Sequence, residues 1–192
     1  MRGDLACRPQ DARVWEPRVM PEGVNFSSVE TLHDGRRVEI RALRPEDSKG
    51  LIEAVNRSSV ESIRRRFFSI RRHFSEREID FFTHIDFVSQ VALVVVAEEG
   101  GEPHIVGGGR YIVVEPGRAE IAFFLVDEYQ GQGIGATLMR HLAALARDAG
   151  LRELFAEVLP ENLAMLKVFR KSGLNPAATR DAGVVHVRLP LS

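Results

Sequence analysis

The alternation of apolar and polar residues predicts a chain built from both strands and helices. Residues 38–43 alternate with a period of two, and several short β-branched apolar runs are bounded by glycine- or proline-containing turns. The pattern predicts strands at residues 38–43, 91–97, 105–114, 119–126, 154–159 and 184–189. Apolar residues at helical spacing predict helices that begin near Pro45 and Ser75, and others that span residues 60–68, 134–149 and 162–171.

The order of these elements predicts the fold class. The three strands between residues 91 and 126 have short links typical of an antiparallel meander, and the later strand–helix–strand order implies one parallel crossover. We therefore expect one α+β domain over residues 34–192, with a mixed, mostly antiparallel central sheet and flanking helices. Residues 1–33 show no periodicity and are predicted to form an N-terminal arm, disordered or lying over the domain.

Composition limits the kind of protein further. The 192 residues, 44% of them hydrophobic, suit one domain, and a formal net charge of −1 argues against a nucleic-acid partner. The single cysteine, Cys7, excludes an internal disulfide. The longest apolar run is far shorter than the ~20 residues of a membrane helix, and the first residues do not resemble a secretory signal. The six histidines lack metal-ligand spacing. We expect a cytoplasmic protein with neither a metal nor a membrane partner.

The segment between the fourth predicted strand and the longest helix carries the clearest chemical signal. Gly131, Gly133 and Gly135 alternate there, and glycine lets backbone N–H groups approach a ligand with no side chain in the way. Free N–H groups at a helix start favour an anion, and a pyrophosphate is the expected guest. The alternative is a glycine-rich turn without a ligand. A dinucleotide-binding unit would need a parallel sheet before the loop, and a P-loop would need Lys-Ser or Lys-Thr after the glycines.

The loop also resembles a known signature. Gln130-x-x-Gly133-x-Gly135 is similar to the acetyl-CoA motif Q/R-x-x-G-x-G/A of the GNAT superfamily of N-acetyltransferases. The strand order is similar to that family's order, and the resemblance covers residues 37–191. Within the family, the bacterial protein lysine acetyltransferase (Pat) subgroup is most similar at residues 66–68, 119–123 and 159–162. The resemblance implies an acyl-CoA N-acyltransferase fold with acetyl-CoA as co-substrate.

This resemblance implies a set of cofactor contacts. The backbones of Leu125 and Val126 would pair with the pantetheine arm, and Asn162 would hydrogen-bond the pantetheine or an ordered water. The Val126 N–H would also face the oxyanion that forms when an amine attacks the thioester. The pyrophosphate would be held by the loop residues Gln130, Gly131, Gln132, Gly133, Ile134, Gly135 and Ala136.

Two carboxylates are candidates for the general base that an amine acceptor requires. Glu120 lies in an otherwise apolar strand and shares strand parity with Val126, so both side chains are expected on one face. It also matches a glutamate of the Pat subgroup. It could instead be an edge carboxylate, exposed or paired with Arg110 or Arg118. Glu157, on the strand after the longest helix, is the alternative base, or a charge at a strand end.

The resemblance implies direct transfer of acetyl to a primary amine in a ternary complex. The expected acceptor is a protein lysine side chain, with acyl-CoA synthetases as partners. The alternatives are a small-molecule amine, a peptide N-terminus, or a non-catalytic sensor that binds acyl-CoA. The sensor alternative is supported by Phe169, because many family members carry a tyrosine at this position that protonates the departing thiolate. No residue is therefore assigned as general acid.

Two other patterns have mainly structural interpretations. Residues 107–109 are three consecutive glycines inside a predicted strand, which indicates a bulge or bend rather than a second phosphate site. Residues 64–66 are three arginines followed by two phenylalanines. Such a run is typical of a solvated helix face, and the alternative is a contact with nucleic acid or with the CoA 3′-phosphate. In the GNAT family this region shapes the substrate entrance.

Overall fold

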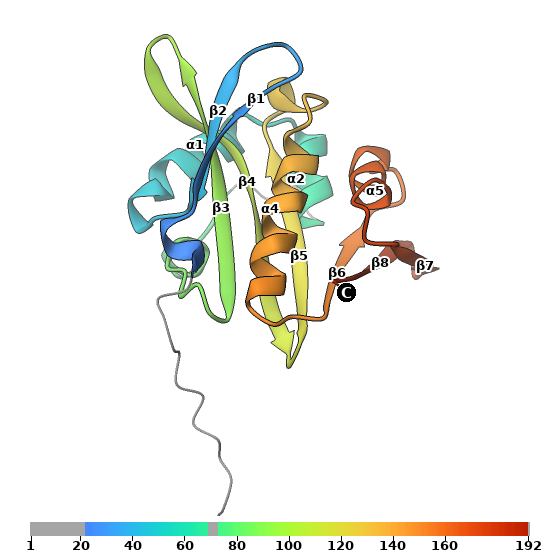
Figure 1. Ribbon diagram of the computed structural model, residues 1–192. Helices are drawn as coiled ribbons and strands as arrows, with labels where there is room; N and C mark the ends of the chain where they lie inside the picture. Colours follow the sequence, from blue (N-terminus) through green and yellow to red (C-terminus); the bar gives the residue numbers. More distant parts are fainter. Residues whose placement is uncertain (1–21, 69–72, 192) are drawn as a thin grey trace, which may run out of the picture.

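The computed structural model describes residues 22–68 and 73–191, which form a single sheet with helices on both faces (Figure 1). The strands of this part are β1 (Ser27–Thr31), β2 (Arg37–Ala42), β3 (Gln90–Glu99), β4 (Glu102–Glu115), β5 (Arg118–Leu125), β6 (Glu153–Val158), β7 (Ala177–Asp181) and β8 (Val184–Pro190). The α-helices are α1 (Ser48–Arg57), α2 (Val60–Phe67), α3 (Glu76–Thr83), α4 (Ile134–Asp148) and α5 (Leu163–Arg170). Short 3₁₀ helices are η1 (Glu22–Asn25), η2 (Pro45–Asp47) and η3 (Asp127–Tyr129).

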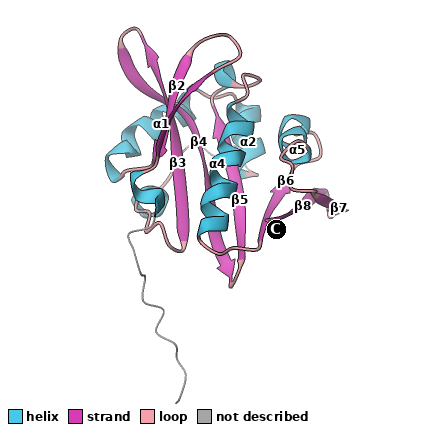
Figure 2. Ribbon diagram, in the orientation of Figure 1, coloured by secondary structure: helices cyan, strands magenta, loops and turns pink. Residues whose placement is uncertain are grey.

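The strand order confirms the predicted fold class. In the described chain the order is β1-β2-β3-β4-β5-β6-β8-β7, and only the β5–β6 pair is parallel. Helix α4 makes the crossover between these two strands, as the late strand–helix–strand pattern predicted. Figure 2 shows the resulting α+β arrangement, in which helices flank a central sheet.

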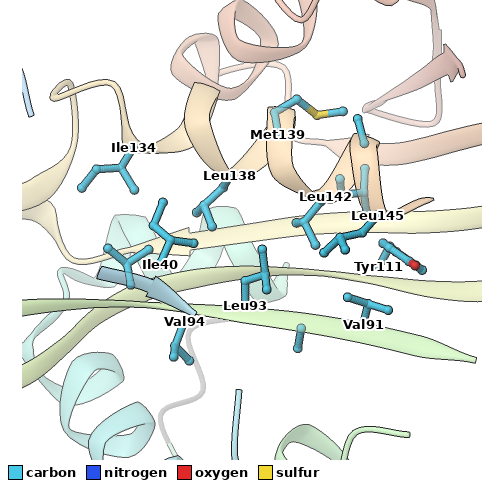
Figure 3. Close-up of a cluster of buried hydrophobic side chains, with 14 of the residues drawn as sticks. Ile40, Val91, Leu93, Val94, Tyr111, Ile134, Leu138, Met139, Leu142 and Leu145 are labelled. Carbon is cyan, nitrogen blue, oxygen red and sulfur yellow. The ribbon is translucent and has the colours of Figure 1, made fainter. Parts of the chain in front are cut away.

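The hydrophobic core lies between α4 and the sheet. Figure 3 shows Ile134 and Leu138 of α4 pointing toward Ile40 and Leu93 on β2 and β3. All four side chains are at most 1% exposed. Val94 points to the opposite face because successive strand residues alternate, and α1 and α2 lie on that side (Figure 1). The helical spacing of apolar residues in α4 therefore marks its buried face correctly.

Local sequence signals explain where several elements begin and end. The Ser75 hydroxyl accepts a hydrogen bond from the Glu78 N–H, and the Glu78 carboxylate accepts one from the Ser75 N–H at 2.8 Å. This reciprocal capping box confirms the predicted start of α3. Gly150, with a φ of 75°, follows α4 and ends it, as the sequence indicated.

The prediction of an arm over residues 1–33 is wrong for residues 22–33, which are the part that the structure describes. Residues 22–33 contain η1 and the edge strand β1, which pairs antiparallel with β2 from Ser27↔Arg41 to Thr31↔Arg37. The β1 side chains remain mostly outside the core, and Val29 is 57% exposed. A strand stabilised by backbone pairing at a sheet edge lacks the apolar alternation from which strands are predicted. The rest of the predicted arm, residues 1–21, lies outside the described residues.

The three consecutive glycines lie in β4 beside a bulge, which confirms their interpretation as a bend. The β3–β4 register shifts between Val95 and Val96, opposite this part of β4. A Cβ on Gly107 would collide with the Phe124 carbonyl oxygen, and a Cβ on Gly108 with the Leu93 carbonyl oxygen. Both positions are thus closed to larger residues by the neighbouring backbones.

The short pairing of β5 with β6 positions the candidate site. The parallel ladder covers only residues 118–120 of β5 and 153–155 of β6. Beyond Glu120, β5 continues for five residues and stays paired with β4 alone. In the described chain, residues 121–125 therefore present one backbone edge that β6 does not cover.

Candidate active site

A cleft opens along the uncovered edge of β5. Its volume is about 570 Å³, and it is lined by the end of β5, the glycine loop and parts of α2 and α5. Of the sequence-predicted site residues, it brings together Leu125, Gln130, Gly131, Gly133, Gly135, Ala136 and Asn162. The cleft is therefore built where the strand pairing stops and α4 begins.

The direction of the β5 peptide groups corrects one predicted contact. The Val126 N–H donates to the Val106 carbonyl oxygen at 2.9 Å, and Val126 is fully buried. It is therefore not free to face an oxyanion in the cleft. Because peptide groups alternate along an antiparallel pair, those of Leu125 and Phe123 point the other way, toward the cleft. The Leu125 carbonyl already accepts a hydrogen bond from Gln130 Nε2 at 3.1 Å.

The glycine loop presents a row of free backbone donors. Among the described residues, the N–H groups of residues 131–135 have no protein acceptor. The N–H groups of Gln130 and Ala136 are engaged, with the carbonyls of Asp127 and Gly133 respectively. Gly131 and Gly133 have φ values of 75° and 94°, which only glycine adopts without strain. Five free donors at the start of a 15-residue helix fit a pyrophosphate.

The charge of the cleft also fits a polyanion. Its arginine and lysine lining residues are Arg65, Arg66, Lys167 and Lys171. No carboxylate appears among the described residues that line it. The sequence interpretation favoured a solvated helix face for Arg65 and Arg66, whereas both line the cleft. It assigned no role to Lys167 and Lys171, although a signal existed. The chain has three lysines, and two of them lie four residues apart on the last helix.

A hydrogen-bond network fixes the glycine loop to α2. The Asp127 carboxylate accepts from the Ser59 N–H at 2.8 Å, the Ser59 hydroxyl at 2.7 Å and the Ser62 hydroxyl at 2.9 Å. Burial opposes ionisation of Asp127, but these hydrogen bonds outweigh it, so the pKa of this carboxyl lies below its ordinary value. Gln130 Nε2 also donates to the Ser62 hydroxyl at 2.9 Å. The Gln130 side chain thus positions the loop.

The two candidate bases meet in a smaller cavity beside the cleft. Glu120 and Glu157 both line this space of about 50 Å³, together with Asn162 and Phe169. The Asn162 side-chain oxygen Oδ1 accepts from the Met165 N–H at 3.1 Å and caps α5. Its side-chain amide is therefore held at the junction of the cleft and the cavity.

Glu120 is the last β5 residue paired with β6, at the point where the strands diverge. Its side chain is exposed, rather than enclosed as the apolar strand sequence suggested. The alternative pairing with Arg118 or Arg110 is wrong. Arg118 binds Glu115 and Glu153, and Arg110 donates to Gln90.

The charge of Glu120 acts on the neighbouring guanidinium of Arg66. Burial lowers the pKa of the Arg66 guanidinium, and the charge of Glu120 opposes that shift. Glu157 instead faces His186 on β8, with 3.5 Å between Oε1 and Nδ1. Of the two candidate bases, Glu157 is the one that contacts a histidine within the described residues.

Phe169 occupies the cavity wall from α5. It is 1% exposed, and its ring lies 6.0 Å from that of Phe123. A phenyl ring carries no transferable proton, so this position supplies packing rather than acid catalysis. None of the described residues that line this cavity carries a side-chain hydroxyl.

A mixed sheet that opens beside a glycine-rich helix start, with free donors and a cationic lining, defines an acyl-CoA N-acyltransferase. The acetyltransferase (GNAT) family matches residues 57–174, more than half of the chain, and the chain belongs to this family. It is an acetyl-CoA-dependent N-acetyltransferase.

The chain is similar to two curated acetyltransferases and to one solved GNAT domain. Acetyltransferase PA5475 of Pseudomonas aeruginosa is 38% identical over 138 residues, which are 71% of this chain and 74% of that protein. Acetyltransferase Pat of Mycolicibacterium smegmatis is 31% identical over 150 residues, 76% of this chain but only 43% of Pat. The crystal structure of the GNAT domain of S. lividans PAT has a TM-score of 0.76 and 33% identity, covering 85% of this chain and 96% of that one. The chain is thus Pat-like.

Two other kinds of site are absent from the described part of the chain. No helix among them is long and apolar enough to cross a membrane. They also contain no group of three or more His, Cys, Asp or Glu residues that could hold a metal ion.

Proposed function

We propose that this acetyltransferase acetylates a lysine side chain of a protein, by direct transfer in a ternary complex with Glu120 as general base. The observation that carries the base assignment is the place of Glu120, at the divergence of β5 and β6 and without a protein ion-pair partner in the described chain. The lysine acceptor rests on similarity to the Pat proteins. An acyl-CoA synthetase is the proposed protein substrate, and the cytoplasm the proposed location.

The β5 edge and the glycine loop would bind acetyl-CoA. The free N–H groups of residues 131–135 suit the pyrophosphate, and the cleft cations suit the remaining phosphate. The peptide groups of Phe123 and Leu125 would pair with the extended pantetheine arm as an added strand does. A free N–H from one of them would stabilise the oxyanion on the thioester carbon.

The acceptor amine must lose a proton before it attacks. A lysine has a pKa of about 10.4 and is almost wholly protonated at neutral pH. A positioned base contributes roughly 10²- to 10⁴-fold in rate. Glu120 accepts this proton, directly or through one water, while the amine attacks the thioester carbon and the thiolate leaves. A thiol of pKa about 8.5 is a fair leaving group, so the position of Phe169 does not prevent the reaction.

Thiol release from acetyl-CoA, with a purified acyl-CoA synthetase as acceptor, tests the base assignment. We expect Glu120→Gln to lower kcat at least tenfold and to leave the dissociation constant of acetyl-CoA unchanged. Glu102→Gln, at the exposed first residue of β4, is the matched control. A larger loss in Glu157→Gln than in Glu120→Gln would move the base role to Glu157.

Mass spectrometry of the acceptor tests the lysine assignment. We expect acetylation at defined lysines of the synthetase. Turnover only with polyamines or other small amines, or only at peptide N-termini, would contradict the lysine acceptor and retain the chemistry. Acetyl-CoA binding without thiol release on any of these amines would instead indicate a sensor.

A further inference from the structure

A second cavity lies on the face of the sheet covered by α1, α2 and α3. Its volume is about 120 Å³, and most of its wall is apolar, with Leu51, Val55, Phe82 and Phe124 among the lining residues. Two guanidinium groups, those of Arg66 and Arg110, also line it. No carboxylate appears among the described lining residues. The cavity therefore holds positive charge in apolar surroundings.

Arg110 is the more deeply buried of the two arginines. It is 8% exposed, and its Nη2 donates to Gln90 Oε1 at 2.6 Å. Its guanidinium carbon lies 5.4 Å from the ring centres of both Phe81 and Phe82. Its Nε is buried and has no hydrogen-bond partner among the described residues. One strong donor of this buried side chain therefore has no acceptor among the described residues.

The charge on Arg110 is costly without an anion. Burial, together with the nearby charge of Arg66, lowers the pKa of Arg110 to about 10, so the group still carries its proton at neutral pH. Aromatic faces and one neutral amide compensate a buried cation only in part. A carboxylate is the group that a guanidinium binds best, through paired N–H donors.

The cavity adjoins the proposed transfer site. Arg110 on β4 lies directly opposite Ala122 on β5, two residues from Glu120. Phe124 and Arg66 line both this cavity and the acetyl-CoA cleft, and Arg66 also lines the cavity of the two glutamates. A volume of about 120 Å³ suits a short fragment of a reactant rather than a whole ligand.

We propose that this cavity binds a carboxylate of one of the two reactants, held by Arg110 with Arg66 adding positive charge. The inference rests on the proposed acyl transfer at the β5–β6 opening. The carboxylate can come from the acyl group, as the distal carboxylate of a dicarboxylic acyl-CoA, which is compatible with the protein lysine acceptor. It can also come from the acceptor, as the carboxylate of an amino acid, which would then replace the protein lysine as acceptor. Either source neutralises the same buried charge.

Paired substrates that differ only in the carboxylate separate the two sources. For the acyl group, succinyl-CoA is compared with butyryl-CoA, which has the same chain length without the charge. For the acceptor, apolar α-amino acids are compared with their amides at a fixed concentration of acetyl-CoA. We expect at least a tenfold preference for the carboxylate in one of these pairs, measured as calorimetric affinity for the CoA esters and as kcat/KM for the acceptors.

Variants of Arg110 then connect the preference to the cavity. Arg110→Gln is expected to abolish the preference and to leave the affinity for free CoA unchanged. Arg180→Gln, on the exposed strand β7, is the matched control and should retain the preference. If Arg110→Gln unfolds, Arg110→Lys keeps the charge without the paired donors and should weaken the preference at least threefold.

The outcomes distinguish this inference from the proposed function. Acetyl transfer without any carboxylate preference in wild type would overturn the cavity assignment and leave the proposed function standing. A preference that survives in Arg110→Gln would overturn the role of Arg110. Failure of the wild-type protein to bind CoA at all would contradict the proposed function and this inference together.

Discussion

At the scale of single residues, the acetyl-CoA site depends mainly on the direction of the β5 peptide groups and on the positive charges that line the cleft. The Val126 N–H is used within the sheet, which leaves the peptide groups of Phe123 and Leu125 for a ligand. Lys167 and Lys171 add charge from α5, and both belong to a cleft lined by no carboxylate of the described chain. Acetyl-CoA affinity should therefore depend on ionic strength.

Removing the two cleft lysines tests this dependence. The double variant Lys167→Gln/Lys171→Gln should raise the KM for acetyl-CoA about three- to tenfold at low salt, since each exposed charge contributes up to about 1 kcal/mol. The wild-type KM should also rise more steeply with salt than that of the variant. Lys49→Gln, on α1 with its side chain 88% exposed, is the control. Equal salt dependence in wild type and double variant would contradict the role of these lysines.

At the scale of elements, the junction of β5, η3 and α4 shapes the anion site. Gly133 immediately precedes α4 in a left-handed conformation, and a Cβ there would lie 3.1 Å from His33 Nε2. Gly131 is also left-handed, with a φ of 75°, but a Cβ there would meet nothing within 4 Å. A side chain at either glycine would therefore strain the backbone, but only a side chain at Gly133 would also crowd a neighbouring residue.

This difference gives a matched pair of variants. Gly133→Ala should weaken acetyl-CoA binding at least about tenfold, because roughly 1–2 kcal/mol of left-handed strain adds to the contact with His33. Gly131→Ala should lose less, because strain acts there alone. Calorimetric dissociation constants, with melting temperatures as a check on folding, provide the comparison. Wild-type affinity in Gly133→Ala would show that the loop geometry is not used for the ligand.

The same elements show how far sequence reasoning reaches. The strands β3 to β5 and the helix α4 carry long apolar patterns, and their order predicted the mixed sheet and the glycine loop correctly. The strands β1 and β7 were missed because their side chains lie largely outside the core, with all five residues of β7 exposed. Backbone pairing at a sheet edge stabilises them, and this leaves no apolar period in the sequence.

The candidate site could also be predicted only in part, because some of its features are local in the sequence and others depend on strand pairing. The motif located Gln130, Gly131 and Gly133 at the cleft, since glycine and helix signals are local. Which β5 peptide groups face the cleft depends on the pairing of β5 with β4, which a single strand sequence does not specify. The cavity near Arg110 likewise forms from α1, α2, α3 and the sheet together, and no local pattern marks it.

At the scale of the whole molecule, a buried ion pair joins the sheet to the first helices. Arg41 on β2 contacts Asp47 at the start of α1 through Nη1–Oδ2 at 2.7 Å and Nη2–Oδ1 at 2.8 Å. The Arg44 N–H donates to the same carboxylate at 2.8 Å. Burial opposes ionisation of Asp47, but these contacts outweigh it, and its pKa lies below the ordinary value.

This lowered pKa predicts a pH-dependent stability. The contribution of Asp47 is fully present above its unfolded pKa of about 3.9 and is lost as the pH falls through the lower folded value. Asp47→Asn should reduce the free energy of unfolding by about 3 kcal/mol at pH 7, because it leaves Arg41 without its buried partner. Urea unfolding between pH 3 and 7 should show this difference shrinking in acid. A difference that stays constant with pH would contradict the assignment.

The central claim is that acetyl-CoA binds along the uncovered edge of β5 and on the glycine loop. Amide hydrogen exchange with and without acetyl-CoA, resolved by residue, tests it most directly. We expect slower exchange at Phe123, Leu125 and residues 131–135 in the presence of acetyl-CoA, and no change in β7. Protection confined to other parts of the chain, or none at these amides under saturating acetyl-CoA, would contradict the account.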